Sequence, residues 1–235
     1  AAYRAAGFKF VFDTNFTADL TIVEEGTEFL NRIVEMLYKQ GTITDEDVKK
    51  LGMHKGVNAT LPMITSCSPG WIKYIEHYYG DQLDNVSSCK SPHMMLGALT
   101  KSYFADKIGK KPEDMYVVSI MPCTAKKYEV TRPEMMNNGT KNVDAVLTTR
   151  ELARMIKESG IEFTKLKDGV FDNPLGISSG AADIFGSTGG VMEAALRTAY
   201  NLVTGEDLEK VEFNDTRGLE GVKTGVVDIK GTKLK

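Results

Sequence analysis

"MYVVSIMPC", residues 115–123, is the stretch that decides the fold class. The run is almost continuously apolar, which is typical of a strand in a parallel sheet that is covered on both faces. A second strand-like run, VDAVLTT (143–149), follows it and leads into a helix-like run, RELARMIKESG (150–160). Earlier in the chain, LPMITSC (61–67) predicts a short buried strand. Strands and helices therefore alternate, which predicts the α/β class, with mostly parallel sheets flanked by helices.

The remaining patterns predict further elements around these layers. FKFVFD (8–13) alternates as a strand does, and a helical apolar period begins at about Asp19. Residues 41–60 are polar and punctuated by glycine, so we expect an excursion out of the core with a short helix after Thr44. Two alternating segments in residues 210–235 predict a β-hairpin or a small mixed sheet. Other helices are predicted over residues 69–80, 91–109 and 191–203.

The composition of the 235 residues is that of an ordinary globular protein, with 42% hydrophobic and 26% charged residues. The net charge of −3 is small and the basic residues do not cluster, which argues against a nucleic-acid partner. No apolar stretch reaches the roughly 18 residues that a membrane span needs, and the first residues lack the apolar segment of a signal peptide. We therefore expect a soluble, cytoplasmic protein. Its three cysteines favour reduced thiols over a disulfide framework.

Two of the cysteines share a setting. Cys67 and Cys123 each end a short apolar strand close to a proline, in TSCSP and MPCTAKK. Because ligands gather at the carboxyl ends of strands in α/β sheets, the two thiols either face one site or are small buried hydrophobic side chains. Cys89 lies in a loop between two predicted helices, and a purely structural role is its alternative.

The acidic run EEGTE places Glu25 and Glu28 three residues apart on a predicted helix, with Arg32 one turn after Glu28. One interpretation is a solvated helix face with an i,i+4 ion pair. The other is that both carboxylates point inward and form two steps of a proton relay.

Positive charge and glycine suggest anions at two other places. Lys126 and Lys127 follow Cys123 at a helix start, where the helix dipole disfavours positive charge, so we expect a negative ligand to hold at least one of them. The glycine-rich residues 176–190 precede a helix and are either an anion site or a tight turn. Only the anion site would favour a nucleotide-binding α/β protein.

Four motifs, in this order along the chain, carry a family resemblance: EEGTEFLNR (24–32), TSCSPGW (65–71), MPCTAKKYE (121–129) and IFGSTGGVMEAALR (184–197). Together they resemble the catalytic domain of iron-only ([FeFe]) hydrogenases, over residues 1–235 and without a separate accessory iron–sulfur domain. The resemblance implies a two-lobed fold and an H-cluster, which is a [4Fe–4S] cubane bridged to a di-iron unit with CO, cyanide and a dithiolate amine. It also implies reversible reduction of protons to H2, with ferredoxin or another electron-transfer protein or subunit as partner.

The resemblance assigns a proton path to five residues. Cys67 matches the thiol that exchanges protons with the dithiolate amine, and a thiol with a pKa near 8.5 does this more readily than a hydroxyl. Glu25, Ser87 and Glu28 match the rest of the path, and Arg32 lies near its outer end.

The cofactor pocket is assigned in the same way. Lys126 matches a donor to cyanide, and Met121 and Phe185 match apolar neighbours of the di-iron unit. Ser91 and His93 are expected to bind the cofactor as well, although His93 stands where the family often has glutamine.

The iron ligands depart from the family pattern. Cys123 matches a cubane ligand, but Ser68 stands where the commoner motif TSCCP has a ligating cysteine. Cys89 is the spare thiol, so we expect it to lie near Ser68 and one of the two to complete or support the cubane. The chain also lacks the family's third cysteine motif. We therefore expect a fragment or split subunit, incomplete at both ends, that needs a further segment or second subunit and retains no stable H-cluster alone. The rival hypothesis is a non-catalytic iron–sulfur scaffold or assembly protein of the same superfamily.

Overall fold

The computed structural model describes residues 1–208, 211, 213–215, 221–229 and 232–234. The chain forms two units, each discontinuous in sequence. The first unit comprises Ala1–Ala18, Ser66–His77 and Lys90–Ser178, and the second comprises Asp19–Thr65, Tyr78–Cys89 and Ser179–Lys235. Helices and strands alternate in the first unit, which confirms the α/β class.

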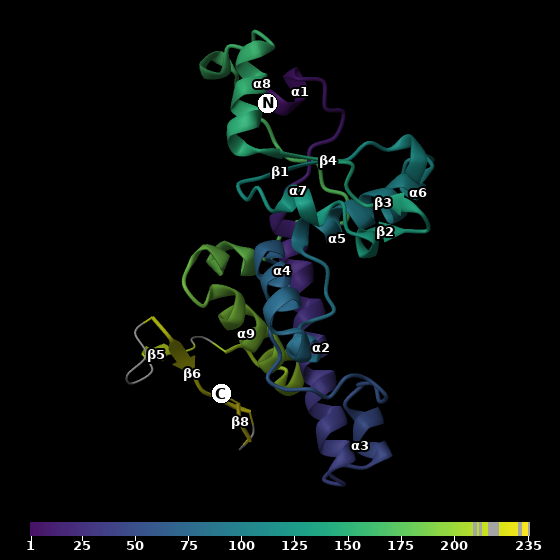
Figure 1. The fold of residues 1–235 in the computed structure, drawn as a ribbon, viewed down its shortest axis with the longest axis vertical. Coiled ribbons are helices and arrows are strands. Elements are labelled where there is room, and N and C mark those ends of the chain that lie inside the picture. Colours follow the sequence, from purple (N-terminus) through teal and green to yellow (C-terminus); the bar gives the residue numbers. More distant parts are fainter. Residues whose placement is uncertain (209–210, 212, 216–220, 230–231, 235) are drawn as a thin grey trace. The chain divides into compact units, whose positions relative to one another are not determined.

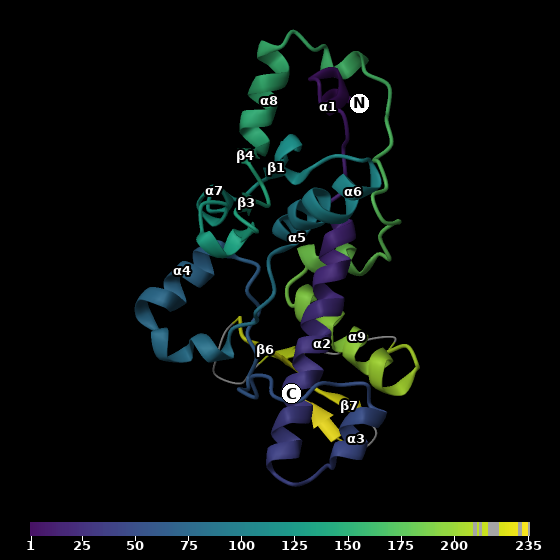
Figure 2. The same ribbon diagram turned by 90° about the vertical axis from the view of Figure 1, so that its right-hand side faces the viewer.

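The apolar run that decides the fold forms one strand of a two-stranded parallel sheet in the first unit. Strand β1 (Val118–Met121) pairs in parallel with β4 (Ala145–Thr148), and the two lie side by side in Figure 1. Helix α8 (Thr149–Glu158) begins directly after β4 because Thr148 and Glu151 form a reciprocal capping box. Figure 2 shows α8 next to α1 (Ala2–Ala5). Ala2 of α1 belongs to the same hydrophobic cluster as the buried residues of α8.

The predicted helix over residues 91–109 is a continuous helical segment with one widened turn. It consists of α5 (Pro92–Leu99), a π-helical turn (Thr100–Phe104) and α6 (Ala105–Lys107). Gly97 is required in α5 because a Cβ atom at this position would clash with the carbonyl oxygen of Asn142. This close approach packs Met94 of α5 against Val143 and Val146 of the core.

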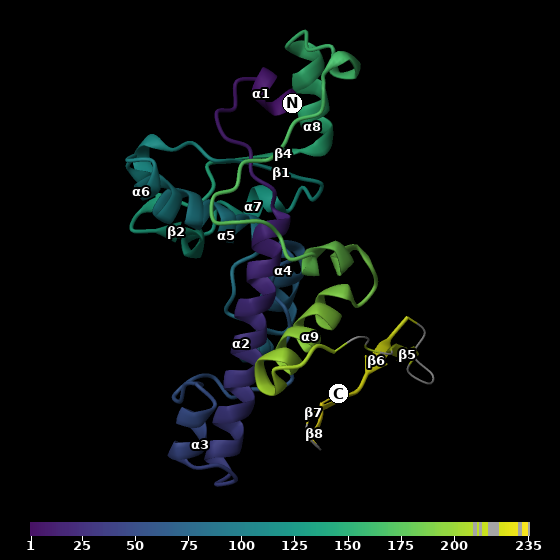
Figure 3. The same ribbon diagram turned by 180° about the vertical axis from the view of Figure 1, so that it is seen from behind.

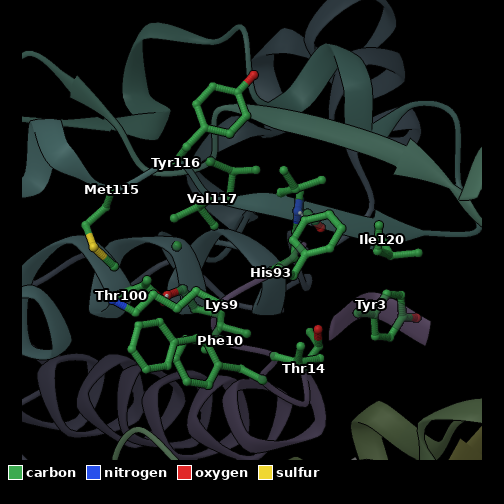
Figure 4. A pocket seen from close by; sticks show the side chains of 18 of the residues that line it. Tyr3, Lys9, Phe10, Thr14, His93, Thr100, Met115, Tyr116, Val117 and Ile120 are labelled. Carbon is green, nitrogen blue, oxygen red and sulfur yellow. Dashed lines mark hydrogen bonds between the residues drawn. The ribbon is translucent and has the colours of Figure 1, made fainter. Parts of the chain in front are cut away.

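The prediction of a strand over residues 8–13 was wrong. The segment is extended, but no described strand pairs with it. Val11 instead forms two hydrogen bonds with Asp172, from its N–H to Oδ2 (2.7 Å) and from the Asp172 N–H to its carbonyl oxygen (2.7 Å). A cavity of about 630 Å³ separates this segment from β1 and is lined by Phe10, Val117 and Ile120 among others (Figure 4). The alternating pattern alone therefore does not make a strand, because a strand requires a neighbour for its backbone groups.

Helix α2 (Asn15–Lys39) begins four residues before the expected Asp19, because Asp13 accepts a hydrogen bond from the Asn15 N–H (3.0 Å) and caps the start. In the second unit, α9 (Gly190–Thr204) lies beside α2, where Gly26 faces Thr198 (Figure 3). The predicted excursion contains α3 (Asp45–Lys50), which Thr44 caps as expected.

Two further predictions meet different outcomes. The expected strand over residues 61–67 is reduced to a single bridge between Ile64 and Val86. The expected hairpin near the end is confirmed by two antiparallel pairs, β5 (Phe213–Asp215) with β6 (Lys223–Gly225) and β7 (Val227–Ile229) with β8 (Thr232–Leu234), although parts of this prediction lie outside the described residues. The other elements are α4 (Pro69–Tyr78), α7 (Lys126–Glu129), the β2–β3 hairpin (Met136–Asn137 with Thr140–Lys141) and short 3-10 turns at Gly80–Asn85, Pro112–Asp114, Pro133–Met135, Phe163–Lys165 and Ala181–Gly186.

Candidate functional site

A buried acid–base cluster in the second unit is built around Glu28 of α2. Its Oε1 accepts hydrogen bonds from Arg32 Nη2 (2.6 Å) and Nε (3.0 Å), and its Oε2 accepts one from the Ser87 hydroxyl (2.8 Å). Glu25, one turn earlier, is only 1% exposed, whereas Glu24 is exposed. The geometry therefore favours inward-pointing carboxylates over a solvated face for Glu25 and Glu28.

Arg32 also holds the loop segments that pack on α2. Its side chain is 2% exposed, and Nη1 donates to the carbonyl oxygens of Thr60 (3.0 Å) and Asp84 (2.9 Å) while Nη2 donates to that of Val86 (2.8 Å). The guanidinium uses nearly all of its five N–H donors in these contacts. Arg32 therefore anchors the chain segments around Glu28.

Cys89 belongs to the same cluster. Its Sγ donates to Glu28 Oε2 (3.7 Å), and its N–H donates to Ser87 Oγ (3.1 Å). Burial, reinforced by the charges of Glu25 and Glu28, raises the pKa of the Cys89 thiol to about 12, although the Ser87 hydrogen bond works against this. The thiol is thus protonated in this environment. The expected closeness of Cys89 to Ser68 remains a prediction, because the two residues belong to different units.

The excursion over residues 41–60 shapes the outer side of the cluster. Asn31 Oδ1 accepts a hydrogen bond from the His54 N–H (2.8 Å), and Glu35 Oε2 accepts one from the Gly56 N–H (2.8 Å). Between the excursion and α2 lies a cavity of about 400 Å³ that Glu28 and His54 both line. The acid–base cluster therefore has a chamber next to it.

A second buried network, in the first unit, surrounds Lys126. The Lys126 ammonium donates to the carbonyl oxygen of Cys67 (2.7 Å) and to Glu129 Oε2 (2.8 Å). The same Glu129 oxygen accepts a hydrogen bond from His93 Nε2 (2.6 Å), and His93 Nδ1 accepts one from the Ser119 hydroxyl (2.9 Å). Figure 4 shows His93 on the wall of the larger cavity.

The charge states of this network follow from burial and contact. Burial lowers the pKa of His93 against the opposing effect of Glu129, so the imidazole is neutral near pH 7. Burial alone would raise the pKa of Glu129, but the hydrogen bond from His93 and the Lys126 charge outweigh it and hold that pKa below its usual value. The negative group expected near Lys126 is thus Glu129, and Lys127 pairs with Glu151 (2.6 Å).

The remaining predicted residues differ in exposure. Cys67 is half-buried, whereas Cys123 and Ser68 are exposed. Ser91 is 1% exposed, and its hydroxyl has no hydrogen-bond partner among the described residues. Met121 ends β1, and Phe185 lies in the 3-10 turn before α9; both are half-buried.

The donors fit part of an iron–sulfur centre. A [4Fe–4S] cubane is normally held by four thiolates, whereas the sequence holds three cysteines, and the described part of the chain contains no group of three or more His, Cys, Asp or Glu placed to bind a metal ion. The buried Ser91 hydroxyl and the Lys126 ammonium, by contrast, suit the hydrogen-bonding of a small anionic ligand. The chain therefore fits one side of such a group, and its thiols alone do not complete the iron ligation.

The thiols and buried donors of the first unit and the carboxylate cluster of the second unit are the residue types of an α/β domain of the iron–sulfur redox class. The comparisons identify it further: the chain belongs to the family described as iron only hydrogenase large subunit, C-terminal domain, whose model matches residues 1–235. It is 52% identical over 236 residues to the NADP-reducing hydrogenase subunit HndD of Solidesulfovibrio fructosivorans, covering 100% of this chain and 37% of that protein. It is 49% identical over 235 residues to the periplasmic [Fe] hydrogenase large subunit of Nitratidesulfovibrio vulgaris, covering 100% of this chain and 51% of that protein.

The solved structures agree with the sequence relatives. An apo [FeFe]-hydrogenase HydA1 variant from Chlamydomonas reinhardtii superposes with a TM-score of 0.76 at 47% identity, covering 94% of this chain and 51% of that one. The chain thus spans 37% to 51% of the length of these relatives. No helix among the described residues is both long and apolar enough to cross a bilayer.

Sequence analysis did not identify Glu129, which links Lys126 to His93. Its position three residues after Lys126 on a helix was the available signal, because i,i+3 pairs share a face. Ser119 and Asn31 carried no comparable signal, since their partners lie far away in the sequence.

Proposed function

We propose that the complete protein containing this chain catalyses the reversible reduction of protons to H2, with electrons from ferredoxin or another electron-transfer protein or subunit. The observation that carries the proposal is the partly buried hydrogen bond between Ser87 and Glu28, with Glu25 buried one turn away on the same helix. A carboxylate and a hydroxyl in contact can pass a proton along, because each both accepts and donates when protonated. Arg32 keeps the Glu28 carboxylate oriented toward Ser87.

The site residues have defined roles in this proposal. Glu28, Ser87 and Glu25 relay protons that enter from the chamber near His54. Cys67, a half-buried thiol, is the last residue of the relay and exchanges protons with the cofactor. Cys123, with Ser68 or Cys89, contributes to iron ligation, and Ser91 and Lys126 donate to anionic ligands. Met121 and Phe185 exclude water. When bound, the H-cluster supplies the iron at which protons and electrons combine.

Glu28→Gln in the complete protein tests the proposal. An amide does not relay protons, so turnover should fall by about a hundredfold or more while iron content and the infrared bands of the cluster stay unchanged. Glu158→Gln, an exposed carboxylate at the end of α8 and outside this chamber, is the control and should retain turnover. Near wild-type turnover in Glu28→Gln would reject the proton path.

The second candidate is a non-catalytic scaffold in iron–sulfur assembly. It is favoured by the 32% identity over 219 residues to the cytosolic Fe-S cluster assembly factor narfl of Xenopus tropicalis, covering 91% of this chain and 42% of that protein. A complete, cluster-loaded protein that neither evolves nor oxidises H2 would support it. We also propose a cytoplasmic location, on the cysteine usage alone; fractionation of cells checks this, since one relative is named periplasmic.

A further inference from the structure

The proposed proton path gives no role to the buried titratable pair of His93 and Glu129. His93 of α5 and Glu129 of α7 are each 3% exposed. They contact each other between β1 and the segment that carries Cys67. Both ring nitrogens of His93 are engaged by protein groups, Nε2 by Glu129 and Nδ1 by Ser119. This arrangement differs from the direct cofactor contact expected for His93.

The direction of each hydrogen bond follows from the charge states. The Glu129 carboxylate accepts, so His93 carries its proton on Nε2, and its Nδ1 is then the acceptor for the Ser119 hydroxyl. Glu129 Oε2 receives both His93 Nε2–H (2.6 Å) and the Lys126 ammonium (2.8 Å). A carboxylate oxygen held from two sides cannot turn away from the ammonium without losing a buried charged hydrogen bond.

We propose that His93 is a positioning residue, which acts through Glu129 to hold the Lys126 ammonium against the carbonyl oxygen of Cys67. Its role in turnover rests on the proposed function, but its role in geometry does not. Lys126 has three N–H donors, and Glu129 and Cys67 occupy two of them, so the direction of the third is set by the same contacts. The imidazole therefore decides where the remaining donor of Lys126 points.

The proposal distinguishes hydrogen bonding from space filling. Glutamine carries an amide N–H donor and a carbonyl acceptor, so His93→Gln can keep both contacts, whereas His93→Leu fills the space and keeps neither. Met94 is adjacent, is fully buried and packs only in the apolar core, so Met94→Ala is the matched control for a loss of packing in the same helix. Glu129→Gln serves as a second route to the same defect, because it weakens the double contact without altering α5.

The experiment uses the complete protein and two measurements, amide hydrogen exchange over residues 66–72 and H2 turnover. In His93→Leu and Glu129→Gln, exchange should rise by about tenfold, as expected for one lost hydrogen bond, and turnover should fall by up to about a hundredfold. His93→Gln should stay close to wild type in both. Equal defects in His93→Gln and His93→Leu, an unchanged His93→Leu, or the same local exchange increase in Met94→Ala would each overturn the proposal. A wild-type protein without H2 turnover would reject the proposed function, while the exchange measurement would still decide the positioning role.

Discussion

Replacing Arg32 by methionine should detach two loop segments from α2. Methionine keeps much of the length of the side chain but removes every donor. The structure shows hydrogen bonds from the guanidinium to Glu28 and to the carbonyl oxygens of Thr60, Asp84 and Val86. All of them lose their donor in Arg32→Met, and the Glu28 charge loses its ion-pair partner.

The size of the effect follows from the burial of the pair. The Arg32 side chain is 2% exposed and that of Glu28 is 16% exposed, so solvent replaces little of what is lost. Breaking a buried ion pair by removing one partner costs about 3–5 kcal/mol. Each 1.4 kcal/mol is a factor of ten, so amide exchange in the anchored segments should rise by roughly two to four orders of magnitude, up to the limit set by global unfolding.

Hydrogen exchange measured by mass spectrometry on the complete protein reads this out locally. The informative amides are those of Ile64, which donates to the Asn85 carbonyl oxygen (2.8 Å), and Ser87, which donates to that of Ile64 (2.7 Å). Arg154→Met, an exposed arginine on α8, is the control and should leave both unchanged. Protection of these amides within a factor of about two of wild type in Arg32→Met would refute the anchoring role.

Three further outcomes are expected. Gly97→Ala should lower the free energy of unfolding by about 1–3 kcal/mol, because the added Cβ meets the Asn142 carbonyl oxygen, and an unchanged denaturation midpoint would contradict the close approach. Cys89 should be alkylated by iodoacetamide far more slowly than the exposed Cys123, since burial raises the Cys89 pKa to about 12; equal rates measured by mass spectrometry would count against the buried thiol. The folded pKa of His93 lies below the ordinary value of 6.5, so its stabilising contribution should be complete above that pH and decline as the pH falls below it. Between about pH 7 and about pH 5, the free energy of unfolding measured by urea titration should fall less in His93→Gln than in the wild-type protein. An equal fall in both proteins would argue against a neutral buried imidazole.

The sequence was sufficient for elements whose interactions are local. The helix predicted over residues 150–160 and the start of α3 after Thr44 were readable, because a helix makes its hydrogen bonds within a few residues. The motif positions of the candidate site were readable too, since they are properties of the chain. The strand predicted over residues 8–13 could not be judged in this way, because its existence depends on a partner strand that no local pattern reveals.

Tertiary structure alone decided how the site residues are held. Arg32 was visible in the sequence as a helical ion-pair partner of Glu28, but its contacts with backbone carbonyl groups were not, since every residue carries such a group. The contact of His93 with Glu129 joins residues 36 positions apart, and only the packing of α5 against α7 creates it. Burial sets the charge of His93, and the contacts with His93 and Lys126 set that of Glu129 against the effect of burial. Both effects depend on surroundings that only the folded chain creates.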